Sequence, residues 1–176
     1  MAKITIKSMD YPTKMSMTYG GTGTLLVNVK KETGTGAVSF QWYKVEDGKE
    51  TAVGGATTKN QFDLSAQKLP AGNHTFRFLA TCDGYEKMSE DIAVTVQKAD
   101  IRSITPPTAQ ENLTYTGQEQ ALITAGSVAN YGTMQYSLTE NGTYSPDIPT
   151  GTDAGAYTVW YRVIGDENHN LSLIHI

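Results

Sequence analysis

The side chains able to do acid–base, nucleophilic or metal chemistry are few in this chain and far apart. There are three histidines, His74, His169 and His175, and one cysteine, Cys82. None of the histidines has a serine or cysteine partner at a spacing typical of a catalytic dyad or triad. The sequence therefore indicates no catalytic centre, and we expect a protein that is not an enzyme.

One polar run could bind a metal ion. Residues 166–170 read DENHN and place oxygen ligands at alternating positions, Asp166 and Asn168, as the start of a calcium loop does. The glycine and the distal glutamate of such a loop are absent. Two interpretations stay open: a calcium site completed by a neighbouring module, or a solvated polar turn that needs no cofactor.

An aromatic group is the second candidate site. Alternation along residues 157–164 directs Trp160 outward, beside Arg162, while Tyr131 and Tyr144 fall in loops of the same half of the chain. An exposed tryptophan next to an arginine can stack on a sugar face or anchor a protein contact. The sequence thus suggests a host glycan or protein as partner. Alternatively, Trp160 covers its own sheet or packs on a neighbouring domain.

Composition and charge restrict the other partners. The net charge is −4, only 18% of the residues are charged, and no basic run occurs, so nucleic acid and anionic membranes are poor partners. No apolar stretch approaches about 18 residues, so this segment contains no membrane span. The N-terminus has no apolar core of a signal peptide.

The strands that position these residues are predicted from the alternation of apolar and polar residues along the sequence. The chain has 10 Tyr and 17 Gly, a composition suited to pleated sheets and tight turns. Val38, Phe40 and Trp42 share one face of a predicted strand, and Tyr157, Val159, Tyr161 and Val163 are predicted to point inward from another. Turn signals such as EDGK, PAGN and ENGT separate the runs. The fold class predicted is all-β, built from antiparallel sheets with one buried face.

The pattern occurs twice. Residues 17–29 (MTYGGTGTLLVNV) align with residues 113–125 (LTYTGQEQALITA) at an offset of 96 (114 − 18), and residues 71–80 align with 154–163 at an offset of 83 (154 − 71). The second copy is thus shorter in its middle, where a loop or strand could be lost. We predict two tandem seven-strand β-sandwiches, residues 1–98 and 99–170, joined by a short, semi-rigid linker.

The second copy resembles the tandem immunoglobulin-like repeats of bacterial cell-surface and secreted proteins. The resemblance spans residues 104–170 and rests on ITPPTAQENLTYTGQEQALITAG, GTMQYSL and IPTGTDAGAYTVWYRVIGDENHN. The first copy is more divergent, with SFQWYK and LPAGNHTFRFLA. Such modules serve as stalks, spacers or adhesive units, so the resemblance implies an extracellular or cell-surface location and neighbouring domains of the same chain as partners.

Two structural features follow from this reading. Asp153, Gly155 and Tyr157 resemble the tyrosine corner of such sandwiches, where a tyrosine hydroxyl bonds back to the main chain. The first copy has Pro70 and His74 in the places of Asp153 and Tyr157, which leaves its corner in doubt.

A second feature is the core tryptophan. Trp42 occupies the place of the tryptophan on the central strand of a sandwich, and the sequence alignment gives Leu138 in that place in the second copy.

The last six residues, 171–176 (LSLIHI), are set apart from the fold. They resemble the translation of a transposon-end sequencing adapter, and such segments are left out of fold reasoning. On this interpretation the natural reading frame is interrupted after Asn170, and the second sandwich lacks most of its last strand.

Three functional hypotheses follow. The first is a non-catalytic spacer, or stalk, of a larger bacterial surface or secreted protein. The second is an adhesin or carbohydrate-binding module that uses the aromatic group around Trp160. The third is an accessory domain of a large secreted hydrolase, with catalysis elsewhere in that protein.

Overall fold

The computed structural model describes residues 6–33, 35–129 and 131–175. The first five residues of the first predicted domain and Ile176 of the tail lie outside the described residues. The chain divides into two compact units, Met1–Gln97 and Lys98–Ile176, called unit 1 and unit 2 below. Each unit is described by itself.

Unit 1 is built from ten strands and one short 3₁₀ turn over its described residues. The strands are β1 (Ile6–Asp10), β2 (Lys14–Thr18), β3 (Thr24–Leu26), β4 (Asn28–Lys31), β5 (Ser39–Glu46), β6 (Lys49–Thr57), β7 (Gln61–Asp63), β8 (Gly72–Cys82), β9 (Tyr85–Met88) and β10 (Ile92–Gln97), with the turn at Ser65–Gln67.

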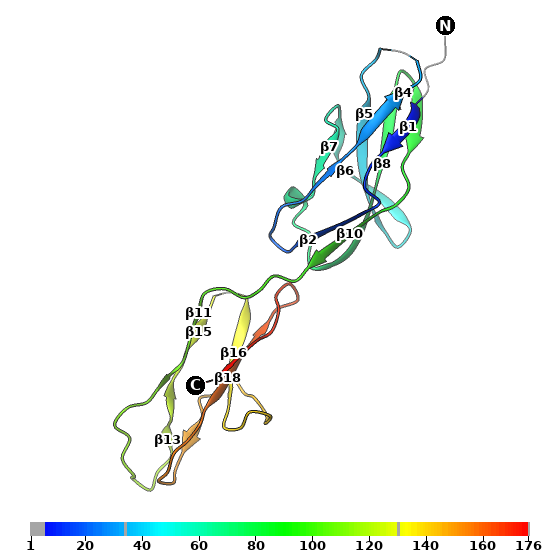
Figure 1. Ribbon diagram of the computed structural model, residues 1–176. Helices are drawn as coiled ribbons and strands as arrows, with labels where there is room; N and C mark the ends of the chain where they lie inside the picture. Colours follow the sequence, from blue (N-terminus) through cyan, green and yellow to red (C-terminus); the bar gives the residue numbers. More distant parts are fainter. Residues whose placement is uncertain (1–5, 34, 130, 176) are drawn as a thin grey trace. The chain divides into compact units, whose positions relative to one another are not determined.

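The larger sheet of unit 1 has the order β2-β10-β8-β5-β6, with β9 also paired to β8. The opposing layer contains the pairs β1–β4 and β3–β7. The prediction of wholly antiparallel sheets is wrong at one place: β2 runs parallel to β10, from Lys14 opposite Ala93 to Thr18 opposite Gln97 (Figure 1).

The core of unit 1 lies between these layers. Trp42 on β5 is 2% exposed and stacks on Phe62 of β7, with ring centroids 4.6 Å apart, so one aromatic pair joins the two layers. Phe78 on β8 lies 5.1 Å from Trp42 between ring centroids. The alternation of side chains along each strand decides which of them point into the core. Ile92, Val94 and Val96 of β10 are all buried, while the residues between them are exposed.

Two Asp-Gly hairpins fix the register of the larger sheet. Asp47 and Gly48 both have positive φ, 50° and 75°, and close the turn between Glu46 and Lys49. A two-residue hairpin needs this left-handed conformation at both positions, and glycine adopts it without steric cost. Asp83 and Gly84 do the same between β8 and β9.

Unit 2 has shorter strands. They are β11 (Ile104–Thr105), β12 (Thr108–Ala109), β13 (Gln120–Ala121), β14 (Ile123–Thr124), β15 (Ser127–Val128), β16 (Gly132–Ser137), β17 (Thr150–Gly151), β18 (Trp160–Gly165) and β19 (Ser172–His175). One layer is the sheet β16-β18-β19, and the pairs β11–β15, β12–β14 and β13–β17 complete the unit.

The core of unit 2 corrects the sequence alignment. Tyr136 pairs with Tyr161, as Trp42 pairs with Phe78 in unit 1, and Tyr161 aligns with Phe78 at the offset of 83. Tyr136 is 4% exposed, whereas Leu138 is 44% exposed. The counterpart of Trp42 is therefore Tyr136, and the prediction of Leu138 is wrong by two residues.

Residues 171–176 were predicted to lie outside the fold, but part of this tail pairs with a strand. Ser172–His175 forms β19, antiparallel to β18, with Ser172 opposite Val163 and His175 opposite Trp160. In unit 1, the last strand continues along β8 as far as Val96 opposite Gly72. In the described part of unit 2, residues 155–159, which correspond to residues 72–76 of unit 1 at the offset of 83, belong to no strand.

The predicted fold class is confirmed: the chain is all-β, with immunoglobulin-like sandwiches. The larger sheet of unit 1 has the strand order A′GFCC′ of that fold, with Trp42 at the centre of strand C. No helix in the described parts of the chain is long and apolar enough to cross a membrane.

Candidate functional site

An arginine–aromatic cluster occupies the outer face of the β16–β18 pair. Because Tyr161 and Val163 of β18 point into the core, Arg162 between them points away from it. Its Nε and Nη2 donate to Gln135 Oε1 at 3.0 and 2.9 Å, on the facing residue of β16. Its guanidinium carbon lies 4.4 Å from the ring centroid of Tyr144. Cation–π contact and hydrogen bonds thus hold Arg162 in one orientation.

Tyr144 reaches this face through a bridge between two main-chain segments. Ser145 pairs with Tyr136 by hydrogen bonds of 2.7 and 2.9 Å, which brings the loop alongside β16. The Tyr144 hydroxyl donates to Glu140 O at 3.0 Å. The structure therefore unites two of the four predicted ligand-binding residues, Arg162 and Tyr144.

Trp160 lies on the same strand as Arg162, and it is half-buried. The residues on either side of it, Val159 and Tyr161, are buried, and the neighbouring strands flank the indole. Its cross-strand partners are Ser137 on β16, which is buried, and His175 on β19. Only part of the Trp160 ring is therefore accessible to a ligand on the outer face of the sheet.

Tyr131 stands apart from this cluster. It is 46% exposed, and its ring lies 4.5 Å from that of His169 at an interplanar angle of 31°. Gly132, the next residue, pairs with Gly165 at the end of the ladder, and this places Tyr131 beside the turn that follows β18.

That turn contains the predicted metal ligands. Asp166 Oδ1 accepts hydrogen bonds from the Asn168 main-chain N–H at 2.8 Å and from His169 Nδ1 at 2.6 Å. The hydrogen bond from His169 is the main reason that the pKa of Asp166 is lowered. One carboxylate oxygen thus already organises the turn. In the described ranges, no group of three or more His, Cys, Asp or Glu side chains could hold a metal ion.

His169 is the residue of this turn whose role the sequence reading missed. The residue is only 7% exposed, and its ring is held between Asp166 and Tyr131. The three-residue spacing from Asp166 was an available signal, but the stacking on Tyr131 depends on a pairing between residues far apart in the sequence.

The corner residues form the same short bond in both units. The Tyr157 hydroxyl donates to Asp153 O at 2.9 Å. In unit 1, His74 Nε2 lies 2.8 Å from Pro70 O, and since a carbonyl only accepts, the imidazole is the donor. Histidine thus replaces tyrosine with the same four-residue span. Gly155 lies inside the corner of unit 2, two residues before Tyr157.

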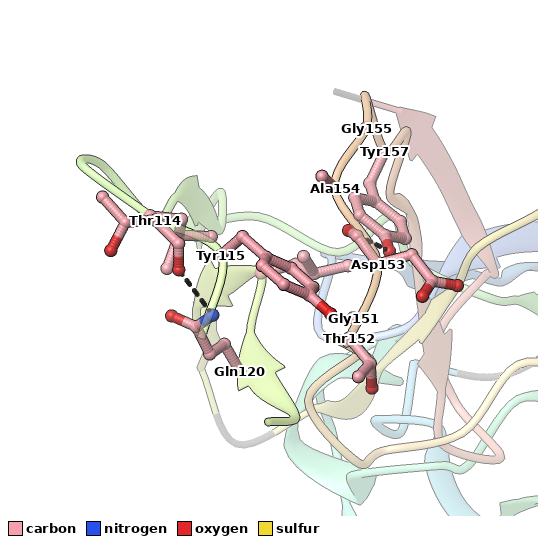
Figure 2. A pocket seen from close by; sticks show the side chains of 11 residues that line it. Thr114, Tyr115, Gln120, Gly151, Thr152, Asp153, Ala154, Gly155 and Tyr157 are labelled. Carbon is pink, nitrogen blue, oxygen red and sulfur yellow. Dashed lines mark hydrogen bonds between the residues drawn. The ribbon is translucent and has the colours of Figure 1, made fainter. Parts of the chain in front are cut away.

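A groove borders this corner in unit 2. It has a volume of about 190 Å³ and is lined on one side by Leu113, Thr114 and Tyr115 and on the other by residues 151–155 and Tyr157. Figure 2 shows Tyr115 extending toward the segment of Gly151 and Thr152, and the corner bond between Tyr157 and Asp153. Tyr157 is 41% exposed here, so the prediction that it points into the core is wrong.

Comparison with known proteins adds little to this geometry. No family model matches the sequence, and no curated protein matches it. Among solved structures, the chain is similar to "Sidekick-1 immunoglobulin domains 1-5", with 9% sequence identity and a TM-score of 0.39, over 98% of this chain and 37% of that one. The chain spans a little over a third of that structure's length. The fold assignment rests on the strand pairing described above.

Proposed function

We propose that the chain is a non-catalytic spacer of a bacterial surface or secreted protein, acting outside the cell. The observation that carries this proposal is the length of the joint. Tyr19 N donates to Gln97 O at 2.8 Å within unit 1, and Ala99 N donates to Asn168 O at 3.0 Å within unit 2. Only Lys98 separates these two hydrogen-bonded positions, so the linker itself has little freedom.

The parallel pair in unit 1 suits a load-bearing role. A force that pulls the two ends of unit 1 apart acts along β2 and β10, which are paired from Lys14–Ala93 to Thr18–Gln97. Because such a force acts at the Lys14 end of β2 and at the Gln97 end of β10, it slides the two strands along each other and loads the hydrogen bonds of the ladder together. Mechanical resistance then requires no binding site and no catalytic residue.

Distance measurements between spin labels test the joint. The pair Lys49→Cys and Asn141→Cys places labels on exposed positions in each unit, while Cys82 is buried and reacts poorly. We expect a narrow distance distribution for the natural joint and a much broader one after six Gly-Ser residues are inserted between Gln97 and Lys98. Equal widths in the two proteins would contradict the spacer proposal.

A second candidate function is ligand binding at the Arg162 cluster. Its support is the contact of Arg162 with Tyr144, next to the half-buried Trp160, which gives an aromatic and cationic surface of the kind that recognises sugars or proteins. Trp160→Ala and Arg162→Ala should each abolish binding on a glycan panel. A natural chain that binds no glycan or surface protein would eliminate this candidate. An accessory role beside a hydrolase domain is the third.

A further inference from the structure

The outer sheet face of unit 2 carries an arginine that is not paired with a carboxylate. In unit 1, Arg77 on the outer face of β8 forms ion pairs with Glu50, at 2.8 Å, and with Asp91. Arg162 on β18 forms no ion pair with a carboxylate in the described parts of the chain. The residue opposite it on β16 is the neutral Gln135. The positive charge of Arg162 is therefore not compensated on this face.

The guanidinium of Arg162 also keeps part of its hydrogen-bonding capacity. Its Nε and Nη2 donate to the single oxygen Gln135 Oε1, at 3.0 and 2.9 Å. Within the described ranges, the N–H groups at the other end of the guanidinium, on Nη1 and Nη2, have no acceptor. Two such N–H groups form a planar fork that matches the two oxygens of a carboxylate. The ring of Tyr144, 4.4 Å from the guanidinium carbon, holds this fork in place.

Apolar surface flanks the charge along β18. Trp160, Arg162 and Ile164 alternate with buried residues of the strand, so they form one row on its outer face. Ile164 is 38% exposed, and Trp160 is half-buried. Part of an indole ring on one side of the guanidinium and an aliphatic side chain on the other suit the apolar C–H face of a sugar ring.

The charge of unit 2 restricts the kind of anion that this face can accept. Residues 98–176 contain eight Asp and Glu against three Lys and Arg, a formal net charge of −5 (3 − 8). A ligand with many negative charges would be repelled by this excess, whereas a ligand with one carboxylate would be repelled much less. Acidic peptides and nucleic acids are therefore disfavoured, and a sugar with a single carboxylate is favoured.

We propose that the outer face of β16 and β18 binds an acidic sugar, whose carboxylate is held by Arg162. The N–H groups on Nη1 and Nη2 would donate to the two carboxylate oxygens, and the sugar ring would lie against the accessible part of Trp160. This inference rests on the second candidate function, because it names the ligand class of the same cluster, and it does not depend on the spacer role. Since an open face covers little of a ligand, we expect roughly millimolar dissociation constants for single sugars.

Two pairs of sugars test the proposal on the full chain. Methyl glucuronide differs from methyl glucoside in having a carboxylate in place of a hydroxymethyl group, and methyl galacturonide differs from methyl galactoside in the same way. NMR titration follows the side-chain N–H signals of Arg162 and Trp160. We expect at least one acidic sugar to bind at least about tenfold more tightly than its neutral partner, because the neutral sugar lacks the charge-assisted hydrogen bonds.

The other outcomes overturn the proposal in distinguishable ways. Equal binding of acidic and neutral sugars at the cluster would preserve the second candidate function and eliminate the role of the carboxylate. No binding of any of the four sugars at tens of millimolar would eliminate both. Binding of N-acetylglycine as tight as that of the acidic sugars would assign the guanidinium to a peptide C-terminus. None of these results bears on the spacer proposal, which the label distances test separately.

Matched variants locate the site. Gln135→Glu keeps the side-chain size and the acceptor for Arg162 but supplies a carboxylate from the chain itself. We expect the fold to be retained and acidic-sugar binding to weaken at least about tenfold, because the guanidinium charge is then compensated. Arg102→Gln removes a positive charge from an exposed position of unit 2 outside β16 and β18, and should leave binding within about twofold. Equal effects of the two changes would place the sugar elsewhere and contradict the proposal.

Discussion

The two units use one plan and differ at one edge. In unit 1, β8 runs for 11 residues and is paired along its length, and the corresponding strand of unit 2, β18, runs for only 6. Residues 155–159 of unit 2, which correspond to residues 72–76 of β8, belong to no strand in the described chain. In unit 1, β10 pairs with residues 72–76 and β8 is extended there. Among the corresponding residues of unit 2, which belong to no strand, Val159 is buried but Tyr157 is 41% exposed, so alternation alone did not bury Tyr157.

The aromatic core differs in a second way. Unit 1 joins its layers through Trp42 and Phe62, a stacked pair at 15° between ring planes. Unit 2 has Tyr136 in the place of Trp42, and its hydroxyl accepts a hydrogen bond from Gly126 N at 3.2 Å. A tyrosine in this place ties the strand to the opposite layer through its polar end, whereas the tryptophan does so by stacking.

The largest effect should come from Trp42→Ala. Removing a fully buried aromatic side chain leaves a cavity, and we expect unit 1 to lose about 3–5 kcal/mol of unfolding free energy. Urea denaturation followed by circular dichroism measures the loss, while the fluorescence of Trp160, then the only tryptophan, reports on unit 2. A loss below about 1 kcal/mol would contradict the central role of Trp42.

The corrected register gives the next largest effect. Tyr136→Ala should destabilise unit 2 by about 3 kcal/mol, because the side chain is 4% exposed, whereas Leu138→Ala should change its stability by less than about 0.5 kcal/mol. Denaturation of both variants side by side decides the register. If Leu138→Ala is the more damaging, the sequence alignment was right and Tyr136 is not the counterpart of Trp42.

Removing the corner hydrogen bond should lower the stability by a smaller amount, which we expect to be similar in the two units. Tyr157→Phe removes the donor to Asp153 O and should cost about 1 kcal/mol. His74→Phe should do the same to the bond with Pro70 O, and His74→Tyr should keep that bond. Thermal denaturation compares the three variants. Should His74→Tyr be as damaging as His74→Phe, the two corners would not be equivalent.

The smallest effect concerns the turn after β18. The pKa of Asp166 is lowered in the folded chain, mainly by the hydrogen bond from His169. Its contribution to stability is therefore present above the unfolded pKa and is lost as the pH falls through the folded pKa. We expect His169→Ala to raise the pKa of Asp166 toward its ordinary value, as followed by NMR titration of the carboxyl carbon. An unchanged pKa would show that His169 does not hold it down.

Local sequence predicted much of the fold because short-range rules govern it. Alternation placed Val159, Tyr161 and Val163 in the core, and all three are buried. The turn signal EDGK marked the Asp47-Gly48 hairpin. The candidate site was predicted less well: Arg162 and Tyr144 do meet, but Trp160 is half-buried and Tyr131 contacts His169 instead. Both differences depend on which strands lie beside these residues.

The all-β class, the strands and most of the inward faces follow from the amino-acid sequence alone, because the period of two and the turn residues act within a few positions. The tertiary structure alone decided that Tyr136 replaces Trp42, that His74 serves as a corner, and that a groove opens beside Tyr157. These features depend on the register and presence of partner strands distant in sequence, and no local pattern encodes them.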